Sequence, residues 1–379
     1  MKSKLPEVGT TIFTVMSRMA AECGAINLSQ GYPDFDCPER LRELVAARLN
    51  GGCNQYPPMA GVMELRERIA EKVAAHYGFS PDPETEITVT SGATEAVFDA
   101  VQAVVHPGDE VIMFDPAYDC YEPAVQLAGG KAVRLPLTQP DYGVDWDLTA
   151  ENITDRTRMI MINSPHNPCG SILEPADLDR LAELIRGAGI YVMSDEVYEH
   201  MVFDGLGHAS VAAHEELSAL SFAIFSFGKT YHATGWKLAF CIAPPALTEE
   251  FRKVHQFVTF TSSSFVQYAI ADFLAECPEH AWELPRFYQR KRDLFCELMA
   301  PSRFRFTPSK GTYFQLADYS AISDLPDREF ANWLTREIGV AAIPLSPFYR
   351  TPSGARHIRF CFCKEDATLE RAAEILRSL

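Results

Sequence analysis

The sequence predicts an α/β fold with a mostly parallel sheet. Through the middle of the chain, short apolar runs alternate with segments of helical periodicity. The runs are nearly continuous in apolar residues, which is typical of strands covered by helices on both faces. We expect strands at 87–92, 110–116, 158–165, 191–198, 223–228 and 238–243.

Helical patterns fill the gaps between these strands. They cover 93–105 and 175–189, and the second has a proline at its start and a glycine at its end, as helix termini prefer. After about residue 245 the pattern changes to helical segments at 246–275 and 279–299, alternating segments at 304–318 and 357–363, and a final helix from about 365. We therefore expect a large domain at 46–289 and a small α+β domain built from 1–45 and 290–379.

Composition excludes several classes of partner. The formal net charge of -17 argues against nucleic acid and anionic membranes. No apolar run approaches the length of about 18 residues that a membrane span needs, and the start of the chain lacks the apolar core of a signal peptide. The ten cysteines form no CxxC pair, so we expect reduced thiols in a cytoplasmic protein and no metal.

Polar residues follow several of the predicted strands at the point where each strand ends. In an open parallel sheet these ends meet at one edge, where ligands bind. We expect a site there. The residues concerned are Thr90, Ser91, Gly92, Asn163, Asn167, Asp195, Ser226 and Lys229.

Two segments of this group could hold a phosphate and an aldehyde. The turn 91–94 leads from a strand into a helix, so its unpaired N–H groups suit an anion; an ordinary tight turn with Ser91 as the N-cap is the alternative. A partly desolvated Lys229 would have a lowered pKa and could form a Schiff base, with Ser226 and Lys237 near a phosphate; a solvated loop lysine is the alternative.

Two further charges are candidates for ligand binding. Asp195 could hold a protonated ring nitrogen, with the Tyr198 hydroxyl on the same side, or it could cap a helix. Arg359 alternates with apolar neighbours in a strand, where its guanidinium suits a carboxylate. That carboxylate could belong to a substrate or to an acidic residue of the chain.

Taken together and in this order, these motifs resemble the fold-type I pyridoxal-phosphate enzymes of the aspartate-aminotransferase superfamily. They are SQGYPDF (29–35), NQYPPMAG (54–61), VTSGATEA (89–96), NSPHNPCG (163–170), SDEVYE (194–199), SFGKTYHATGWK (226–237) and RFCF (359–362). FDPAYDCYEP (114–123) and AAIPLSPFY (341–349) are similar to the kynurenine and glutamine branch and to bacterial methionine aminotransferases. The resemblance implies a large domain with a mostly parallel seven-stranded sheet.

The resemblance also implies roles for the cofactor site. Lys229 matches the lysine that forms the aldimine with pyridoxal 5'-phosphate and moves the proton in a ping-pong aldimine/pyridoxamine cycle. Asp195 matches the acid beneath the ring nitrogen. The other matches are Asn167 and Tyr198 at the 3'-oxygen, Tyr118 on the ring face, and Ala93, Thr94, Ser226 and Lys237 around the phosphate. Lys237 stands where many relatives have arginine. Lysine keeps the positive charge but lacks the forked guanidinium that can bind two oxygens of a phosphate.

The substrate side follows from the same resemblance. Arg359 and Asn167 match the clamp for the α-carboxylate, and Gly31 matches a mobile loop. Tyr56 matches a tyrosine that reaches the phosphate of a neighbouring subunit, which implies a homodimer with shared sites.

The distal pocket should take an apolar or aromatic amino donor. We expect segments 10–15 and 256–265 and the region around Phe348 to line it with aromatic, apolar or hydroxylic side chains and without a second arginine. Phe13 and Phe260 match pocket aromatics, with ordinary core packing as the alternative. Aromatic rings favour a thioether sulfur, so methionine fits well, and the acceptor is a 2-oxo acid. Phenylalanine, tyrosine, kynurenine and glutamine are alternative donors, so a kynurenine- or glutamine-type aminotransferase is the alternative within this family.

Two other functions share this pattern. A cysteine-conjugate β-lyase would use the same residues and would release pyruvate and a thiol without a 2-oxo acid. A ligand-sensing domain of a transcription regulator would carry a basic DNA-binding segment, whereas this chain is acidic and keeps Lys229, Asp195 and Arg359.

Overall fold

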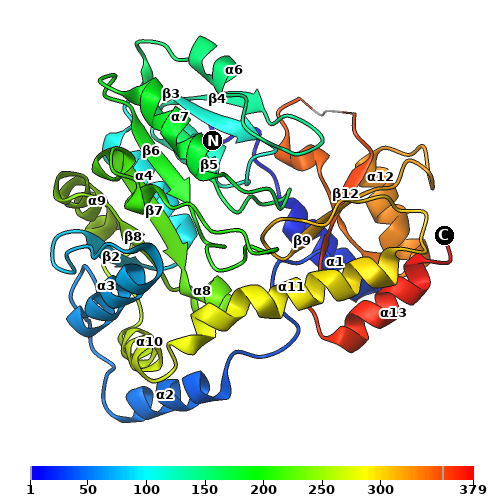
Figure 1. Cartoon of the computed structure of the whole chain (residues 1–379), viewed down its shortest axis with the longest axis horizontal. Helices are drawn as coiled ribbons and strands as arrows, with labels where there is room; N and C mark the ends of the chain where they lie inside the picture. Colours follow the sequence, from blue (N-terminus) through cyan, green and yellow to red (C-terminus); the bar gives the residue numbers. More distant parts are fainter. Residues whose placement is uncertain (1, 352–353) are drawn as a thin grey trace.

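A seven-stranded sheet forms the centre of the protein. The computed structural model describes residues 2–351 and 354–379. The strand order is β2–β8–β7–β6–β5–β3–β4, and every neighbouring pair is parallel except those that β8 makes with β2 and β7. The expected mostly parallel seven-stranded sheet is confirmed (Figure 1). Its strands are β2 (Ile87–Thr90), β3 (Glu110–Asp115), β4 (Lys131–Pro136), β5 (Thr157–Asn163), β6 (Tyr191–Asp195), β7 (Ser221–Ser226) and β8 (Ala239–Ile242).

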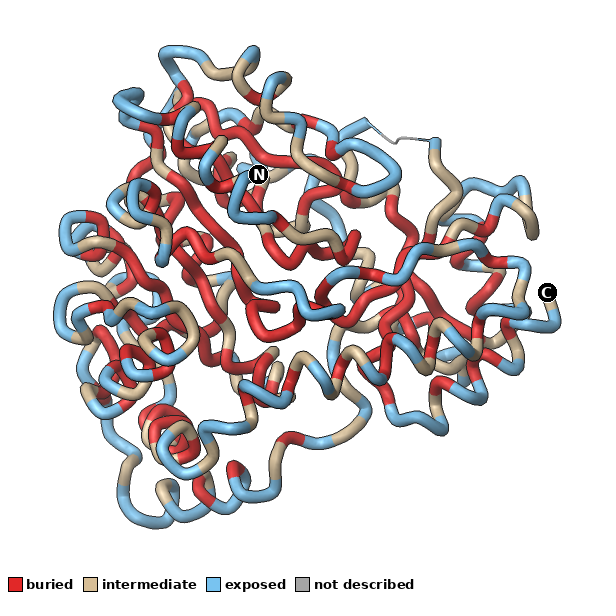
Figure 2. Tube along the Cα trace, viewed as in Figure 1, coloured by how far each residue is buried: buried red, intermediate tan, exposed pale blue. Residues whose placement is uncertain are grey.

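The inner strands of the sheet bury both of their faces. On β5, Met159 and Met161 pack with one helix layer, while Ile160 and Ile162 pack with the other, because successive side chains point to opposite faces. The first layer consists of α4 (Ala93–Val104), α5 (Tyr121–Leu127) and α9 (Pro245–Val258). The second contains α3 (Met63–Tyr77), α7 (Pro175–Ile185) and α10 (Ser264–Glu276), with α2 (Glu39–Asn50) against α10. Figure 2 shows the sheet as the most continuously buried part of the trace.

A second core surrounds a smaller antiparallel sheet. Its strand order is β11 (Ile343–Pro344), β12 (His357–Cys361), β9 (Phe314–Asp318). Helices α11 (Glu279–Met299) and α13 (Asp366–Leu376) pack against each other here. Strand β1 (Ile26–Asn27) pairs in parallel with β10 (Val340–Ala341), so the N-terminal segment packs against this unit as expected. The remaining helices are α1 (Ile12–Cys23), α6 (Trp146–Glu151), α8 (Phe227–Thr230) and α12 (Asp327–Trp333).

Three sequence predictions need correction. The helical segment at 246–275 is two helices, α9 and α10, separated by a Ser- and Thr-rich stretch in which Phe260 has a left-handed backbone (φ 69°). The alternating segment at 304–318 forms a strand only over β9, because Pro308 and Gly311 interrupt the pattern. Strand β4 was absent from the predicted runs, since Lys131 and Arg134 interrupt the apolar residues of this edge strand.

The two-domain division stays a prediction. Its proposed boundaries, at 45/46 and 289/290, fall inside α2 and α11. Figure 1 shows α11 running from beneath the large sheet to the side of α13, so this helix joins the two regions. Residues 1 and 352–353, which the proposed small domain includes, lie outside the described residues.

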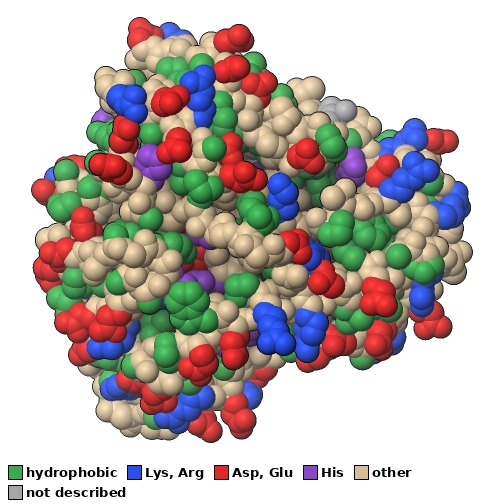
Figure 3. Space-filling view, viewed as in Figure 1, with side chains coloured by type: hydrophobic (Ala, Val, Ile, Leu, Met, Phe, Trp, Pro, Cys, Tyr) green, Lys and Arg blue, Asp and Glu red, His purple; other side chains and the backbone are tan. Residues whose placement is uncertain are grey.

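The surface has no continuous basic region on the face in Figure 3, where acidic and basic side chains are interspersed. No helix in the described part of the chain is both long and apolar enough to cross a bilayer.

Candidate active site

The predicted site residues lie along one edge of the large sheet. Asn163 and Asp195 are register partners at the ends of β5 and β6. Ser226 ends β7 and is paired with Ala239, the first residue of β8. Because β8 runs opposite to its neighbours, its start lies at this same edge, which brings in Lys237 two residues earlier.

A cavity of about 290 Å³ opens at this edge. It is lined by residues from both sheets and by the N-terminal segment. Of the predicted site residues, Thr90, Ser91, Tyr56 and Phe260 do not line it. The others do: Phe13, Gly31, Gly92, Ala93, Thr94, Tyr118, Asn163, Asn167, Asp195, Tyr198, Ser226, Lys229, Lys237 and Arg359.

The turn from β2 into α4 forms one end of the cavity. Gly92 is the N-cap residue, with φ 86°, so Ser91 is not the cap. The first N–H groups of the helix, from Ala93 onward, have no acceptor within the helix. A Cβ on Gly92 would lie 2.9 Å from the Cε and Nζ atoms of Lys237. Only glycine lets this lysine approach the turn so closely, and together they form a cradle for an anion.

Lys229 lies on the short helix α8, directly after β7. Its Nζ is 3.4 Å from the carbonyl oxygen of Gly31, to which it donates, and lies 5.7 Å from the ring centre of Tyr198. Burial lowers the pKa of Lys229 to about 8. An amine with this pKa has a substantial neutral, nucleophilic fraction near neutral pH.

Asp195 is held from two sides. The Tyr121 hydroxyl donates to its Oδ2 at 2.6 Å, and Asn163 Nδ2 donates to its backbone oxygen at 2.8 Å. Burial raises the pKa of Asp195, while the Tyr121 hydrogen bond opposes that shift. Sequence reasoning assigned no role to Tyr121; the second tyrosine of FDPAYDCYEP, at the start of a helix, was the available signal. A buried carboxylate placed this way is suited to a cationic partner.

Arg359 is the central charge of the small sheet. It is fully buried on β12, and its Nη1 and Nη2 atoms donate to Asn167 Oδ1 at 2.7 Å and to the Ser29 carbonyl at 2.9 Å. Its Nε atom has no hydrogen-bond partner. Among the described residues no carboxylate lies within ion-pair distance of this guanidinium, so the acidic partner considered above is not present. Burial lowers the pKa of Arg359, because a charged guanidinium is costly away from water.

Aromatic rings complete the wall. The Phe13 ring lies 6.2 Å from Tyr118 and 5.6 Å from Phe348, between centres, and 5.3 Å from the Arg359 guanidinium carbon. The ring centre of Phe314 lies 3.8 Å from the same guanidinium carbon. Phe13 and Tyr118 therefore give the cavity wall an aromatic, apolar surface.

Tyr56 and Phe260 lie outside the cavity. They form an edge-to-face pair with ring centres 5.8 Å apart. Their exposed fractions, 86% and 44%, are high for aromatic residues. Whether they reach a partner subunit's site stays a prediction.

Comparison with known proteins decides the family. A family model described as aminotransferase class I and II matches residues 24–376. The chain belongs to the class I and II aminotransferases. It is 51% identical to methionine aminotransferase of Escherichia coli K12, covering 100% of this chain and 98% of the relative. It is 32% identical to rat kynurenine–oxoglutarate transaminase 1, covering 99% and 96%.

Solved structures agree with this family. The crystal structure of YbdL from Escherichia coli, described as a methionine aminotransferase, superposes with a TM-score of 0.98 at 51% identity, covering 100% of this chain and 99% of that one. N-succinyldiaminopimelate aminotransferase of Mycobacterium tuberculosis gives a TM-score of 0.96 at 37% identity, covering 100% and 99%. The protein is therefore an aminotransferase with the fold-type I architecture.

Class I and II aminotransferases generally depend on pyridoxal phosphate, and the cavity fits that group. The cradle at Gly92 and Lys237 suits a phosphate, Asp195 suits a pyridinium nitrogen, and Lys229 suits an aldehyde. The unpartnered Nε of Arg359 remains for a second anion.

The lowered pKa of Lys229 predicts an amine that reacts at unusually low pH. Only the neutral amine is nucleophilic, so in protein freed of carbonyl ligands its acetylation should reach half-maximal rate near pH 8. Ordinary lysines require about pH 10.4. Peptide mass spectrometry across a pH series gives both profiles. Lys253 is the control, because Glu250 and Glu249 raise its pKa; identical profiles for the two lysines would contradict the assignment.

Proposed function

We propose that this aminotransferase uses pyridoxal 5'-phosphate, bound through Lys229, to transfer the amino group of an apolar or aromatic L-amino acid to a 2-oxo acid. Methionine is the favoured donor. One observation carries the proposal: an amine of lowered pKa, a buried carboxylate and a buried guanidinium without an ion pair surround a single cavity. The three groups are Lys229, Asp195 and Arg359.

Different residues of the cavity would hold different parts of the cofactor. When bound, pyridoxal phosphate supplies a conjugated ring that delocalises the negative charge left on the substrate Cα after its proton is removed. Asp195, oriented by Tyr121, keeps the ring nitrogen protonated. Asn167 and Tyr198 would hold the 3'-oxygen by hydrogen bonds, and Tyr118 would cover the ring face.

Anchoring and proton transfer fall to the remaining groups. N–H groups of Ala93 and Thr94, with Ser226 and Lys237, bind the phosphate. The Nζ of Lys229 would accept the proton from the substrate Cα and would carry that proton during the transfer. Its pKa of about 8 allows it to act as base and as acid near neutral pH.

Arg359 would bind the substrate α-carboxylate. The fork already has Asn167 and Ser29 as orienting partners, and its free Nε faces no competing acid. The Gly31 carbonyl, which accepts hydrogen bonds from Lys229 and Tyr313, belongs to the loop that would cover the substrate.

The side-chain end of the cavity supports an apolar donor. Within the described lining, Arg359 is the sole arginine, and Phe13, Tyr32, Tyr118 and Phe314 supply aromatic surface. A thioether packs well against such rings. The methionine and kynurenine enzymes among the relatives agree with this choice.

A homodimer in the cytoplasm completes the proposal. The exposed pair Tyr56 and Phe260 would cover the partner's site, Tyr56 at the phosphate and Phe260 at the substrate. Ten unpaired cysteines suit a reducing compartment.

The direct test is the visible absorption spectrum of the purified protein before and after L-methionine is added without any 2-oxo acid. We expect a band of bound pyridoxal phosphate that converts to the pyridoxamine phosphate spectrum, because the amino group stays on the enzyme when no acceptor is present. The variant Lys229→Ala should show no such conversion in repeated cycles.

Other outcomes of this test change the proposal in defined ways. Conversion with kynurenine or phenylalanine and none with methionine would overturn the favoured donor and keep the reaction. Release of pyruvate and a thiol from a cysteine conjugate, without conversion, would replace the transferase by a β-lyase. No band after pyridoxal phosphate is supplied would contradict the cofactor.

The Arg359 assignment predicts a uniform loss across substrates. Because every amino acid presents the same α-carboxylate, Arg359→Ala should lower kcat/KM for all donors by about 100-fold, the value of one or two charged hydrogen bonds. Arg359→Lys keeps the charge without the fork and should lose less. Steady-state kinetics with methionine, phenylalanine and glutamine measure the loss in kcat/KM. A loss confined to one donor would contradict the role of Arg359 in binding the α-carboxylate. Melting temperatures of the variants control for damage to the fold.

A further inference from the structure

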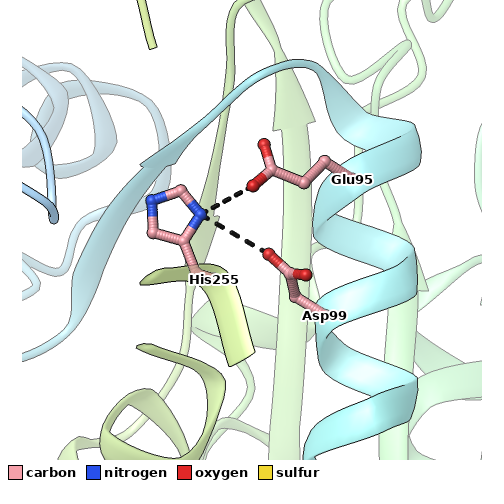
Figure 4. A group of neighbouring side chains, drawn as sticks. All are labelled: Glu95, Asp99 and His255. Carbon is pink, nitrogen blue, oxygen red and sulfur yellow. Dashed lines mark hydrogen bonds and ion pairs between the residues drawn. The ribbon is translucent and has the colours of Figure 1, made fainter. Parts of the chain in front are cut away.

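Behind the anion cradle lies a buried group of three charges that the proposed mechanism does not use. Glu95 and Asp99 lie one turn apart on α4, and His255 faces them from α9 (Figure 4). His255 Nδ1 is 2.7 Å from Glu95 Oε1 and 3.5 Å from Asp99 Oδ2. Asp99 and His255 are fully buried, and neither Asp99 oxygen has a hydrogen-bond partner.

The geometry identifies His255 as an imidazolium. Its Nε2 faces the Met59 carbonyl at 3.0 Å and its Nδ1 faces the carboxylates, so both nitrogens lie opposite acceptors and both must carry a hydrogen. Burial alone would lower the pKa of His255, but the nearby carboxylates of Asp99 and Glu95 raise it to about 9.

A proton fits this group better than a metal ion. The three side chains are of ligating types and lie close enough together to be considered. A tetrahedral ion bonded at about 2.0–2.1 Å to Nδ1 and to Oε1 would hold these atoms about 3.3 Å apart. The observed 2.7 Å is a hydrogen-bond distance.

One arm of the group reaches the anion cradle. The second carboxylate oxygen of Glu95, Oε2, accepts a hydrogen bond from the backbone N–H of Ser91. Glu95 therefore spans the turn 91–94, and His255 fixes the carboxylate that does so. Without the imidazolium, this buried carboxylate would lack its charged partner. The hydrogen bond from Ser91 would then no longer be held in place, and the turn would be less well fixed.

The other arm reaches the segment that carries Tyr56. Met59, whose carbonyl accepts from His255 Nε2, lies three residues after Tyr56. Thr261 Oγ1 donates to the Pro58 carbonyl at 3.2 Å, and the Phe260 N–H donates to the His255 carbonyl at 3.0 Å. One histidine thus connects the cradle with the exposed aromatic pair Tyr56 and Phe260.

We propose that His255 is a positioning residue for phosphate binding: its imidazolium, held by Glu95 and Asp99, fixes the turn 91–94 and, through Met59, the Tyr56 segment. The inference rests on the proposed function, because it takes the phosphate of pyridoxal phosphate as the anion in the cradle. It assigns to His255 no contact with substrate or cofactor.

The test compares two ligands that differ only in the phosphate. Full-length wild type and His255→Gln are loaded with pyridoxal phosphate or with pyridoxal, and the release rate of each after desalting is followed by visible absorption. We expect His255→Gln to release pyridoxal phosphate about tenfold faster, a difference of about 1.4 kcal/mol, with the pyridoxal rate unchanged. Glu95→Gln, a smaller change, should shift the same ratio in the same direction.

The control is His76→Gln. It removes another half-buried histidine, which stacks on Trp282 and does not line the cavity, so it should change neither release rate. Equal acceleration of both ligands in His255→Gln and in Glu95→Gln would mean general loosening and would overturn the proposal, as would unchanged rates in both. One equivalent of a divalent metal in the purified wild type would overturn the proton bridge. Failure of wild type to bind pyridoxal phosphate at all would instead reject the proposed function on which the inference rests.

Discussion

Asn163 and Asp195 are register partners on adjacent parallel strands, and the rest of the site depends on that alignment. Parallel strands end at a common edge, so a polar residue placed directly after each apolar run needs no further device to meet the others. Strand β8 is antiparallel to β7, so its beginning lies at this same edge. Lys237, two residues before that beginning, therefore also reaches the site. The sheet thus determines where the cavity opens and which charges surround it.

The charges around the cavity are incompletely paired. Arg359 has neutral partners and one free nitrogen, Asp195 has a hydroxyl and backbone contacts but no ion pair, and the turn at Gly92 presents N–H groups beside a lysine. Unpaired buried charges are costly in a folded protein and persist where a ligand completes them. In the proposed function, pyridoxal phosphate and an amino acid would supply the three missing partners: a phosphate for the turn, a ring nitrogen for Asp195 and a carboxylate for Arg359. That complementarity connects the fold to aminotransferase chemistry.

Much of this arrangement could be predicted from the sequence, because the information is local. Apolar runs predicted six of the strands in the large sheet. Six of the polar or glycine residues that follow these runs line the cavity: Gly92, Asn163, Asn167, Asp195, Ser226 and Lys229. The missed features depend on contacts between distant residues. Tyr121 reaches Asp195 across 74 positions, and His255 meets Glu95 across 160, which no spacing rule reveals. The break between α9 and α10 follows from the left-handed backbone at Phe260, a conformation that helical periodicity does not encode.

The most direct measurement of the central claim is the site of covalent attachment of the cofactor. The purified protein is treated with borohydride in the presence of pyridoxal phosphate, which converts a lysine-bound carbonyl adduct into a stable amine, and is then digested and mapped by mass spectrometry. The account predicts the reduced adduct on Lys229, in the peptide that follows β7. Attachment to Lys237 or to another lysine, with Lys229 unmodified, would contradict it.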